Sequence, residues 1–410
     1  MALFEWGEYM MMQNAGALSG VVVLDLTRVV AGPFATSWLA DMGATVIKIE
    51  NPGDGGDHSR ASVPFVDDIS AWYSALNRSK KPVTLNLKDP RGKHLFMELV
   101  KKADVVTENF RPGVMDRLGV GYEDIKKVNP KIIMASVSGY GSFGPYSQRP
   151  GYDVVAQGMG GIMSLTGFPD APPTRCGTTL GDITAGMNLV IGILAALHSA
   201  RTTGVGQKLE VALVDSIFSL CAFEFVSYTT TGILPGRKGN NYYQWCPYGT
   251  YKAADGYYQL GVGSDKHFSL LCEKVMGRPD MAQDSRYVSH AARLENRATL
   301  DAAIDAWASA FSVAEVVEKL NAAGVPGCAV YDLSDIEKDP HFAQRDMIKK
   351  MQLSGDQEMR YANMPIHFFG TPNVEPTAPG ALGRCNQEVY SQILGLDENK
   401  INELRMDGVI

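Results

Sequence analysis

Short apolar segments that alternate with helical segments constrain the fold of the first half of this chain more than any other feature. Residues 21–27 (VVVLDLT) form an apolar run of the kind that is buried in a parallel sheet, and a helical stretch begins at Ala31. Further strands are predicted for residues 44–50, 82–88, 103–106 and 131–137. Because strands that alternate with helices form parallel sheets with right-handed crossovers, the sequence predicts an α/β fold.

The character of the chain changes after Asp182. Residues 187–199 and 211–231 are predicted to form two long apolar helices, and the segment that follows has its own turns and short elements. We therefore expect a large domain over residues 1–225, a smaller domain over 226–329, and a C-terminal part over 330–410. With 410 residues, the chain is long enough for two hydrophobic cores.

Composition excludes several classes of partner and site. The net charge of −7 argues against nucleic-acid binding, which requires a basic surface. Six cysteines without a C-x-x-C pair, and seven histidines without H-E-x-x-H spacing, predict neither a disulfide framework nor a metal site. Residues 1–16 lack lysine and arginine, and the apolar run 187–197 is too short to cross a bilayer, so a soluble, cytoplasmic protein without a membrane partner is expected.

Common nucleotide and hydrolase motifs are absent from the sequence. The first strand is followed by TRVVAGP (27–33), where a dinucleotide-binding protein would have G-x-G-x-x-G. Neither a G-x-x-x-x-G-K-[ST] loop nor a G-x-S-x-G motif occurs. The α/β fold must therefore serve another ligand.

Several stretches, in their order and spacing, resemble the class III CoA-transferase family, also called the CaiB/BaiF family. They are residues 23–33, 39–50, 77–81, 108–119, 138–141, 150–153, 204–207, 211–215 and 339–342. The resemblance extends from about residue 19 to the C-terminus. It implies a Rossmann-like large domain whose parallel sheet is formed from both chain ends, an inserted smaller domain, and an interlocked homodimer.

The resemblance also implies a catalytic nucleophile, Asp170, in the segment TGFPDAPP (166–173). A carboxylate that attacks a thioester forms a mixed anhydride and expels a thiolate, which divides one difficult exchange into easier steps. The neighbouring glycines Gly160, Gly161 and Gly167 could let backbone N–H groups approach the oxyanion. Judged without the resemblance, D-A-P-P is a turn sequence in which an aspartate usually bonds only its own backbone.

The resemblance further implies that coenzyme A is a substrate and not a tightly bound cofactor. Its 3′-phosphate and pyrophosphate require cations and backbone donors. The family's CoA-binding positions match Val30, Ala31, Leu85, Asn86, Leu87, Lys88, Asn109, Phe110, Arg111, Arg117, Ser138, Gly139, Tyr140 and Gly141. Arg111 and Arg117 are the preferred phosphate partners, and Tyr140 is expected to contact the pantetheine chain. Without the resemblance, Arg117 and Lys88 would be interpreted as solvated surface charges.

The acceptor acid is less well defined than the donor. Formyl-CoA:oxalate enzymes of this family carry glutamine in place of Val30 and arginine in place of Asn51, so a medium-sized carboxylic acid is expected instead of oxalate. Tyr242, Tyr243 and Trp245 match the family's lid loop, and their bulk suits a larger acyl group. The same aromatic side chains could equally belong to the core of the small domain.

Two alternatives within the same fold remain open at this point. The related 2-methylacyl-CoA racemases use a histidine and an aspartate as an acid/base pair. Asp182 matches the aspartate, but Tyr152 occupies the histidine position, and a tyrosine is ordinarily a poor base at neutral pH. A non-catalytic CoA-binding protein is the second alternative, although Asp170 is retained.

Overall fold

The computed structural model describes residues 16–410 and divides the chain into two compact units. The first unit comprises the described residues up to Ile162 together with Arg175–Val226 and Gln344–Ile410. The second comprises Met163–Thr174 and Ser227–Ala343. The expectation about residues 1–16 falls almost entirely outside the described residues.

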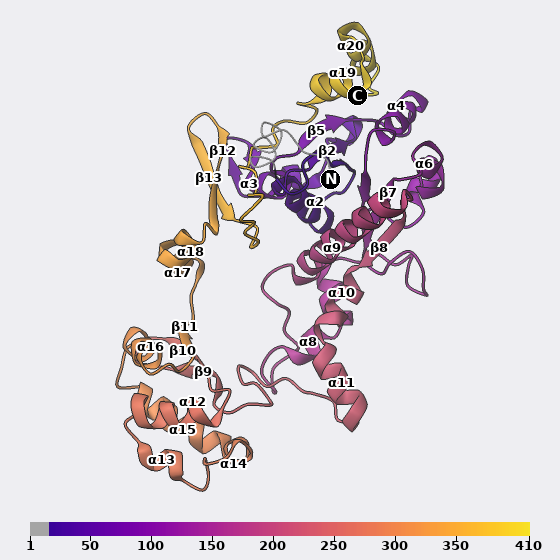
Figure 1. Ribbon diagram of the computed structural model, residues 1–410. Helices are drawn as coiled ribbons and strands as arrows, with labels where there is room; N and C mark the ends of the chain where they lie inside the picture. Colours follow the sequence, from indigo (N-terminus) through magenta and orange to yellow (C-terminus); the bar gives the residue numbers. More distant parts are fainter. Residues whose placement is uncertain (1–15) are drawn as a thin grey trace, which may run out of the picture. The chain divides into compact units, whose positions relative to one another are not determined.

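Six parallel strands form the sheet of the first unit (β2, β5, β7 and β8 are labelled in Figure 1), in the order β5-β2-β1-β6-β7-β8. They are β1 Val22–Asp25, β2 Thr45–Glu50, β5 Lys81–Thr84, β6 Val105–Glu108, β7 Ile133–Ser138 and β8 Lys208–Ala212. In chain order the arrangement is 3-2-1-4-5-6, which is the order of the doubly wound Rossmann fold. The predicted α/β class and the first five strands are thereby confirmed.

Alternate residues of the strands enter two separate hydrophobic cores, one on each face of the sheet. Val23 of β1 packs in the first core and its neighbour Leu24 in the second. Because both faces are buried, the strands are apolar along their length. The first core is closed by α2 (Ala31–Asp41), α7 (Asp153–Met159), α9 (Leu180–Thr203) and α10 (Leu213–Leu220). The second is closed by α4 (Pro90–Val100), α5 (Val114–Leu118), α6 (Tyr122–Val128), α19 (Asn386–Leu394) and α20 (Glu398–Met406).

The expectation that both chain ends supply strands to this sheet is wrong. Among residues 16–410, all six strands lie between Val22 and Ala212, and the C-terminal strands β12 (Ile348–Ser354) and β13 (Gln357–Ala362) pair only with each other. Side chains of α19 close the β5 edge instead. Asn386 Oδ1 accepts from Thr84 N at 2.8 Å, and the Tyr390 hydroxyl donates to Thr84 O at 2.7 Å. With its backbone groups bonded in this way, the edge needs no further strand.

The predicted helix over 211–231 is also wrong in its first part. Val211 and Ala212 belong to β8 and pair with Val137 and Ser138. Helix α10 follows, and a separate α11 covers Ala222–Thr231. The apolar run 187–197 is a part of α9, whose 24 residues are long and apolar enough to cross a membrane. Helix α9 nevertheless packs against α2 and β7, and it contributes Leu189 and Ile193 to the first core.

The second unit has its own core around a small sheet of order β11-β10-β9. Strands β9 (Tyr248–Lys252), β10 (Tyr257–Gly261) and β11 (Gly327–Ala329) are antiparallel. Its helices are α12 (Asp265–Leu270), α13 (Pro279–Gln283), α14 (His290–Glu295), α15 (Arg297–Ala308), α16 (Val313–Ala322), α17 (Leu333–Lys338) and α18 (Pro340–Gln344). The last of these ends at the boundary with the first unit. Glu315 and Ser312 form a capping box at the start of α16, which stops its first turn from fraying.

Buried charges join the strand ends at the centre of the first unit. Lys80 Nζ lies 3.0 Å from Asp25 Oδ2, and Lys48 Nζ lies 2.9 Å from Asp57 Oδ2, with all four side chains fully buried. Burial raises the pKa of Asp25, but the ammonium groups of Lys80 and Lys48 outweigh it and hold this pKa well below its usual value. Burial lowers the pKa of Lys80 to about 8, which still leaves the ammonium protonated at neutral pH.

This network shapes the loop that follows β1. Lys48 Nζ donates to the carbonyl of Thr27, and Asp57 Oδ1 accepts from Val29 N at 3.1 Å. Val29 has a φ of 69°, a conformation that is costly for a β-branched residue. Such strain persists only where surrounding contacts enforce it, and the Asp57 carboxylate supplies one of these contacts here.

The buried pairs lead to a stability prediction. Replacing Lys80 by methionine would leave Asp25 buried without its nearest cation, so we expect a loss of about 3–5 kcal/mol in the free energy of unfolding. The neighbouring Lys81→Met is the control, because Lys81 pairs with Glu388 at the surface and should cost at most about 1 kcal/mol. Urea unfolding of both variants measures the difference, and equal losses would contradict the prediction.

Candidate active site

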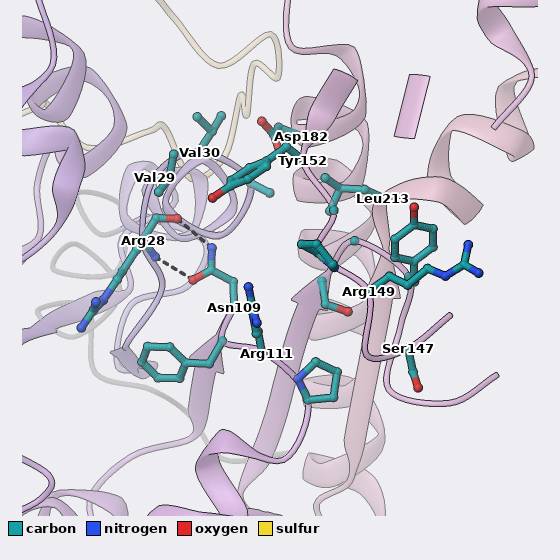
Figure 2. A pocket seen from close by; sticks show the side chains of 18 residues that line it. Arg28, Val29, Val30, Asn109, Arg111, Ser147, Arg149, Tyr152, Asp182 and Leu213 are labelled. Carbon is teal, nitrogen blue, oxygen red and sulfur yellow. Dashed lines mark hydrogen bonds between the residues drawn. The ribbon is translucent and has the colours of Figure 1, made fainter. Parts of the chain in front are cut away.

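A cavity of about 260 Å³ opens at the point where the sheet order reverses, beyond the carboxyl ends of β1 and β6. Ligands of doubly wound folds bind at this switch point. We call it the switch-point cavity (Figure 2). The loops after β1, β6 and β7 supply most of its wall, and Asp182 of α9 and Leu213 of α10 supply the rest. Its lining residues include Arg28, Val29, Val30, Ala31, Asn109, Phe110, Arg111, Ser138, Gly139, Tyr140, Arg149, Tyr152, Asp182 and Leu213.

The Asn109 side chain joins the two loops that form the floor of this cavity. Its Oδ1 accepts from Arg28 N at 2.8 Å, and its Nδ2 donates to Arg28 O at 2.7 Å (Figure 2). The amide thereby satisfies both backbone groups of Arg28, as a neighbouring strand would. Asn109 therefore has a structural role in shaping the cavity, whatever ligand the cavity holds.

A second cavity, of about 270 Å³, lies beyond the carboxyl ends of β2 and β5, and we call it the β5-side cavity. Arg28 and Phe110 line both cavities, and the Arg28 guanidinium carbon lies 5.4 Å from the centre of the Phe110 ring. Arg28 also lies 3.7 Å from Asp54. These two side chains therefore form the wall between the cavities.

The predicted CoA-binding residues are divided between the two cavities. Eight of them line the switch-point cavity: Val30, Ala31, Asn109, Phe110, Arg111, Ser138, Gly139 and Tyr140. Leu85, Asn86, Leu87 and Lys88 line the β5-side cavity, again with Phe110. Arg117 and Gly141 line neither, since the Arg117 guanidinium lies over Gly113 and Gly141 N bonds Ser138 Oγ at 3.0 Å.

Arginine side chains make the switch-point cavity basic. Arg111 was predicted from the family resemblance, whereas Arg28 and Arg149 were not singled out in the sequence. Arg149 stacks over the Tyr146 ring, with its guanidinium carbon 3.8 Å from the ring centre. The position of Arg28, directly after the first strand and at the switch point, is a signal that could have identified it.

Asp182 brings a carboxyl group of altered acidity to the same cavity. It lies in the first turn of α9, close to the buried Asp153. Asp153 accepts from Gly181 N at 2.7 Å and from Gln157 Nε2 at 2.8 Å. Burial and the nearby charge of Asp153 raise the pKa of Asp182 to about 7. A group with such a pKa can both accept and donate a proton near neutral pH.

Asp170 belongs to the second unit, where it occupies an exposed turn. Ala171 N donates to Phe168 O at 3.2 Å, which makes Pro169 and Asp170 the central residues of a β-turn. Thr174 N donates to Thr166 O at 3.2 Å and closes the loop at its base. The predicted turn is confirmed, and its exposed aspartate is accessible to a substrate.

The three glycines expected beside the nucleophile have different roles. Gly160 N bonds Ala156 O at 2.8 Å, and a Cβ on Gly160 would lie 2.4 Å from Ile217, so Gly160 permits close packing. Its N–H is thus already engaged. Gly161 and Gly167 have positive φ angles of 97° and 111°, which a residue with a side chain rarely adopts. Of the three, Gly167 shares a unit with Asp170.

The aromatic segment 242–245 is fixed by its backbone within the second unit. Arg297 donates to the carbonyls of Tyr242 and Trp245, and His290 Nε2 lies 2.7 Å from Gln244 O. Tyr242, Tyr243 and Trp245 are themselves half-buried. The segment therefore has both anchored and accessible surfaces, and its role as a lid stays a prediction. Throughout residues 16–410, no group of three or more His, Cys, Asp or Glu side chains is placed to hold a metal ion.

The fold and cavities define a doubly wound α/β protein with a basic cavity at the switch point of the sheet. A family model described as CoA-transferase family III matches residues 18–384. The chain therefore belongs to this family, and it is a transferase enzyme.

Similar proteins of known name agree with this assignment. The chain is 40% identical over 365 residues to the acetyl-CoA:oxalate CoA-transferase of Acetobacter aceti, across 89% of this chain and 92% of the relative. It is 36% identical over 395 residues to the succinyl-CoA–D-citramalate CoA-transferase of Chloroflexus aurantiacus, across 96% and 98%. Among solved structures, a CaiB/BaiF family protein from Brucella suis aligns with a TM-score of 0.82 at 34% identity, across 93% of this chain and all of that one.

The acidity of Asp182 leads to a prediction about pH. Its pKa is about 7 in the folded chain and about 3.9 when unfolded, so the folded state binds more protons between these values, and stability should fall as pH rises through this range. Asp182→Asn removes this effect. The free energy of unfolding of the variant, relative to that of the parent protein, should therefore rise by roughly 1–3 kcal/mol between pH 5 and pH 8. Unfolding at both pH values tests this, with the exposed Asp356→Asn as control. If the stability of Asp182→Asn relative to the parent protein falls between pH 5 and pH 8, the prediction is contradicted.

Proposed function

We propose that this protein transfers CoA from an acyl-CoA to a carboxylic acid through covalent intermediates on Asp170. The gathering of twelve family CoA positions around two cavities that share Arg28 and Phe110 carries this proposal. A CoA-transferase needs such a site for a long, phosphorylated substrate, together with a carboxylate accessible to the thioester. The exposed turn of Asp170 supplies the carboxylate.

The exchange of CoA between the two acids proceeds in four acyl-transfer steps on the Asp170 carboxylate. The carboxylate attacks the thioester carbonyl, which forms an aspartyl-acyl anhydride and releases the CoA thiolate. The thiolate then attacks the aspartyl carbonyl, which forms an aspartyl-CoA thioester and releases the donor acid. The acceptor carboxylate attacks this thioester, which forms a new anhydride and releases the CoA thiolate. The thiolate finally attacks the acceptor's carbonyl, which forms the product acyl-CoA and frees the Asp170 carboxylate. The overall reaction exchanges one thioester for another of similar energy, so no external energy source is required.

The two cavities support a division of the CoA molecule between them. The phosphate groups need cations, which Arg28, Arg111 and Arg149 offer in the switch-point cavity and Lys88 offers in the β5-side cavity. Arg117 lines neither cavity, and its phosphate contact is predicted from the family resemblance alone. No tightly bound cofactor is required.

We infer that the acceptor is a small dicarboxylic acid. The relatives are named for oxalate, D-citramalate, mesaconate and glutarate, all of which carry two carboxylates. One carboxylate would react and the other would need a cation, and arginine binds a carboxylate through two parallel hydrogen bonds. The sequence predicted only that the acceptor is a medium-sized carboxylic acid, and the proposal adds that it carries a second carboxylate.

Proton exchange at the carbon next to the thioester is the second candidate activity, and Asp182 is the reason to keep it. Its pKa of about 7 suits a general base, and it lines the same cavity as Tyr152. A single base returns the proton to the face from which it came, so racemisation would require Tyr152 to act on the opposite face.

A homodimer is proposed from the surface of α10 and α11. Not one residue of α11 is buried in the single chain, although this helix contains two phenylalanines. Phe223 is 77% exposed, and Phe218 and Leu220 are nearly half exposed. Exposed apolar side chains of this kind on neighbouring helices mark a protein interface, and a second copy of the chain would cover them. The interlocked form of this dimer rests on the family resemblance, and the cytoplasmic location stays a prediction from the sequence composition.

Replacing the nucleophile tests the mechanism. Asp170→Ala should abolish CoA transfer, because no carboxylate remains to form the anhydride, while acyl-CoA affinity stays within about twofold. Incubation of the parent protein with acyl-CoAs and hydroxylamine, followed by mass spectrometry, should trap a hydroxamate at Asp170.

The same experiment separates the alternatives. Asp356→Asn serves as the control variant and should retain full transfer and trapping. Turnover that survives Asp170→Ala would contradict the nucleophile assignment. In that case, α-proton exchange in deuterated water that is lost in Asp182→Asn would favour the second activity, and an absence of both would leave CoA binding alone.

The dimer proposal predicts a particular response to dilution. Linked chains cannot separate without opening, so light scattering should give twice the mass of the chain even at nanomolar concentration. Phe223→Glu places a charge in the proposed interface and should yield monomer or aggregate. A parent protein that is monomeric at all concentrations would contradict the interface.

A further inference from the structure

One arginine binds the backbone on both sides of Asp170. Arg237 lies in the segment between α11 and β9, within the same unit as the turn. Its Nε donates to Phe168 O at 3.1 Å, and one terminal nitrogen donates to Pro169 O at 3.1 Å and to Ala171 O at 2.8 Å. The guanidinium therefore holds the peptide group directly before Asp170 and the one that follows Ala171.

The neighbouring residue Gly239 brings the two segments into direct contact. Gly239 N donates to Gly167 O at 2.9 Å, which adds a fourth bond between the segment around Arg237 and the turn. A Cβ on Gly239 would lie 2.7 Å from the Phe168 ring, so the absence of a side chain permits this approach. With a φ of 61°, the position also favours glycine.

Hydrogen bonds, more than hydrophobic packing, define the shape of this turn. Phe168, Pro169 and Asp170 are all exposed, and none belongs to the hydrophobic core of the second unit. The planar guanidinium has five N–H donors in a rigid fork and can bind several carbonyls at once. A lysine has one nitrogen and could not reproduce this arrangement.

We propose that Arg237 is a positioning residue for the nucleophile, which it orients by holding the carbonyls of residues 168, 169 and 171. This inference rests on the proposed role of Asp170. Arg237 acts through the backbone, so it should govern the rate at which the carboxylate attacks and leave acyl-CoA binding unchanged. Misplacement of a reacting group by about 1 Å can lower a rate by roughly 10²-fold.

Single-turnover kinetics of Arg237 variants test this inference. Arg237→Ala should lower the rate of hydroxylamine-trapped acylation at Asp170 by roughly 10²-fold, with KM for acyl-CoA within about twofold of the parent. Arg237→Lys should lose roughly tenfold, because it retains one of the contacts. Added guanidinium chloride at millimolar concentration should restore part of the rate to Arg237→Ala and none to Asp170→Ala.

Hydrogen exchange supplies a readout that does not depend on activity. Amides of residues 163–175 should exchange faster in Arg237→Ala, whereas those of 297–308 in α15 should be unchanged. Arg286→Ala is the matched control, because Arg286 forms a surface pair with Asp284 in the same unit and should behave as the parent. If Arg237→Ala does not fold, Arg237→Lys gives the same comparison.

The outcomes distinguish the two proposals. Turnover in Asp170→Ala overturns the nucleophile assignment and with it the role of Arg237. An inactive Asp170→Ala combined with an acylation rate in Arg237→Ala within about threefold of the parent overturns the role of Arg237 alone. A large rise in KM at unchanged acylation rate would also overturn it, because it would place Arg237 in substrate binding.

Discussion

Four charges without access to water set the geometry on which the rest of the first unit depends. Asp25 ends β1 and pairs with Lys80, which precedes β5, while Lys48 of β2 pairs with Asp57 in the segment that follows β2. A buried charge that loses its partner is very unfavourable, and the strand ends therefore have little freedom to shift. The strained loop at Val29, and the cavity wall that it forms, depend on this arrangement.

Local pattern was sufficient to predict the parallel sheet and insufficient to predict its edges. The strands at the centre are buried on both faces, so their apolar runs stand out in the sequence. β8 lies at one edge, and residues 211–220 continue its apolar character directly into α10, which conceals the change from strand to helix. At the other edge, Asn386 and Tyr390 bond Thr84 from 302 and 306 residues away, and no local pattern reveals that they replace a strand.

Local sequence pattern likewise predicts only a part of the candidate site. Twelve of the residues around the two cavities could be identified from family motifs, since these motifs follow strand ends. Arg149 and Arg237 could not, because a single arginine has no periodicity or spacing that separates it from a solvated surface charge. The bonds of Arg237 cross 66 to 69 residues of sequence, and only the folded chain brings their partners together.

The closure of the β5 edge by α19 has a consequence for the order of events during synthesis. The ribosome completes Thr84 about 300 residues before Tyr390, which at 5–20 residues per second is a delay of roughly 15–60 s. Throughout that interval the nascent sheet lacks α19, which packs against β5 and contributes Val389 and Tyr390 to the second core of the finished chain. The emerging chain thus presents an open, apolar sheet edge to the cell, which is the kind of surface that chaperones bind and that aggregation begins from.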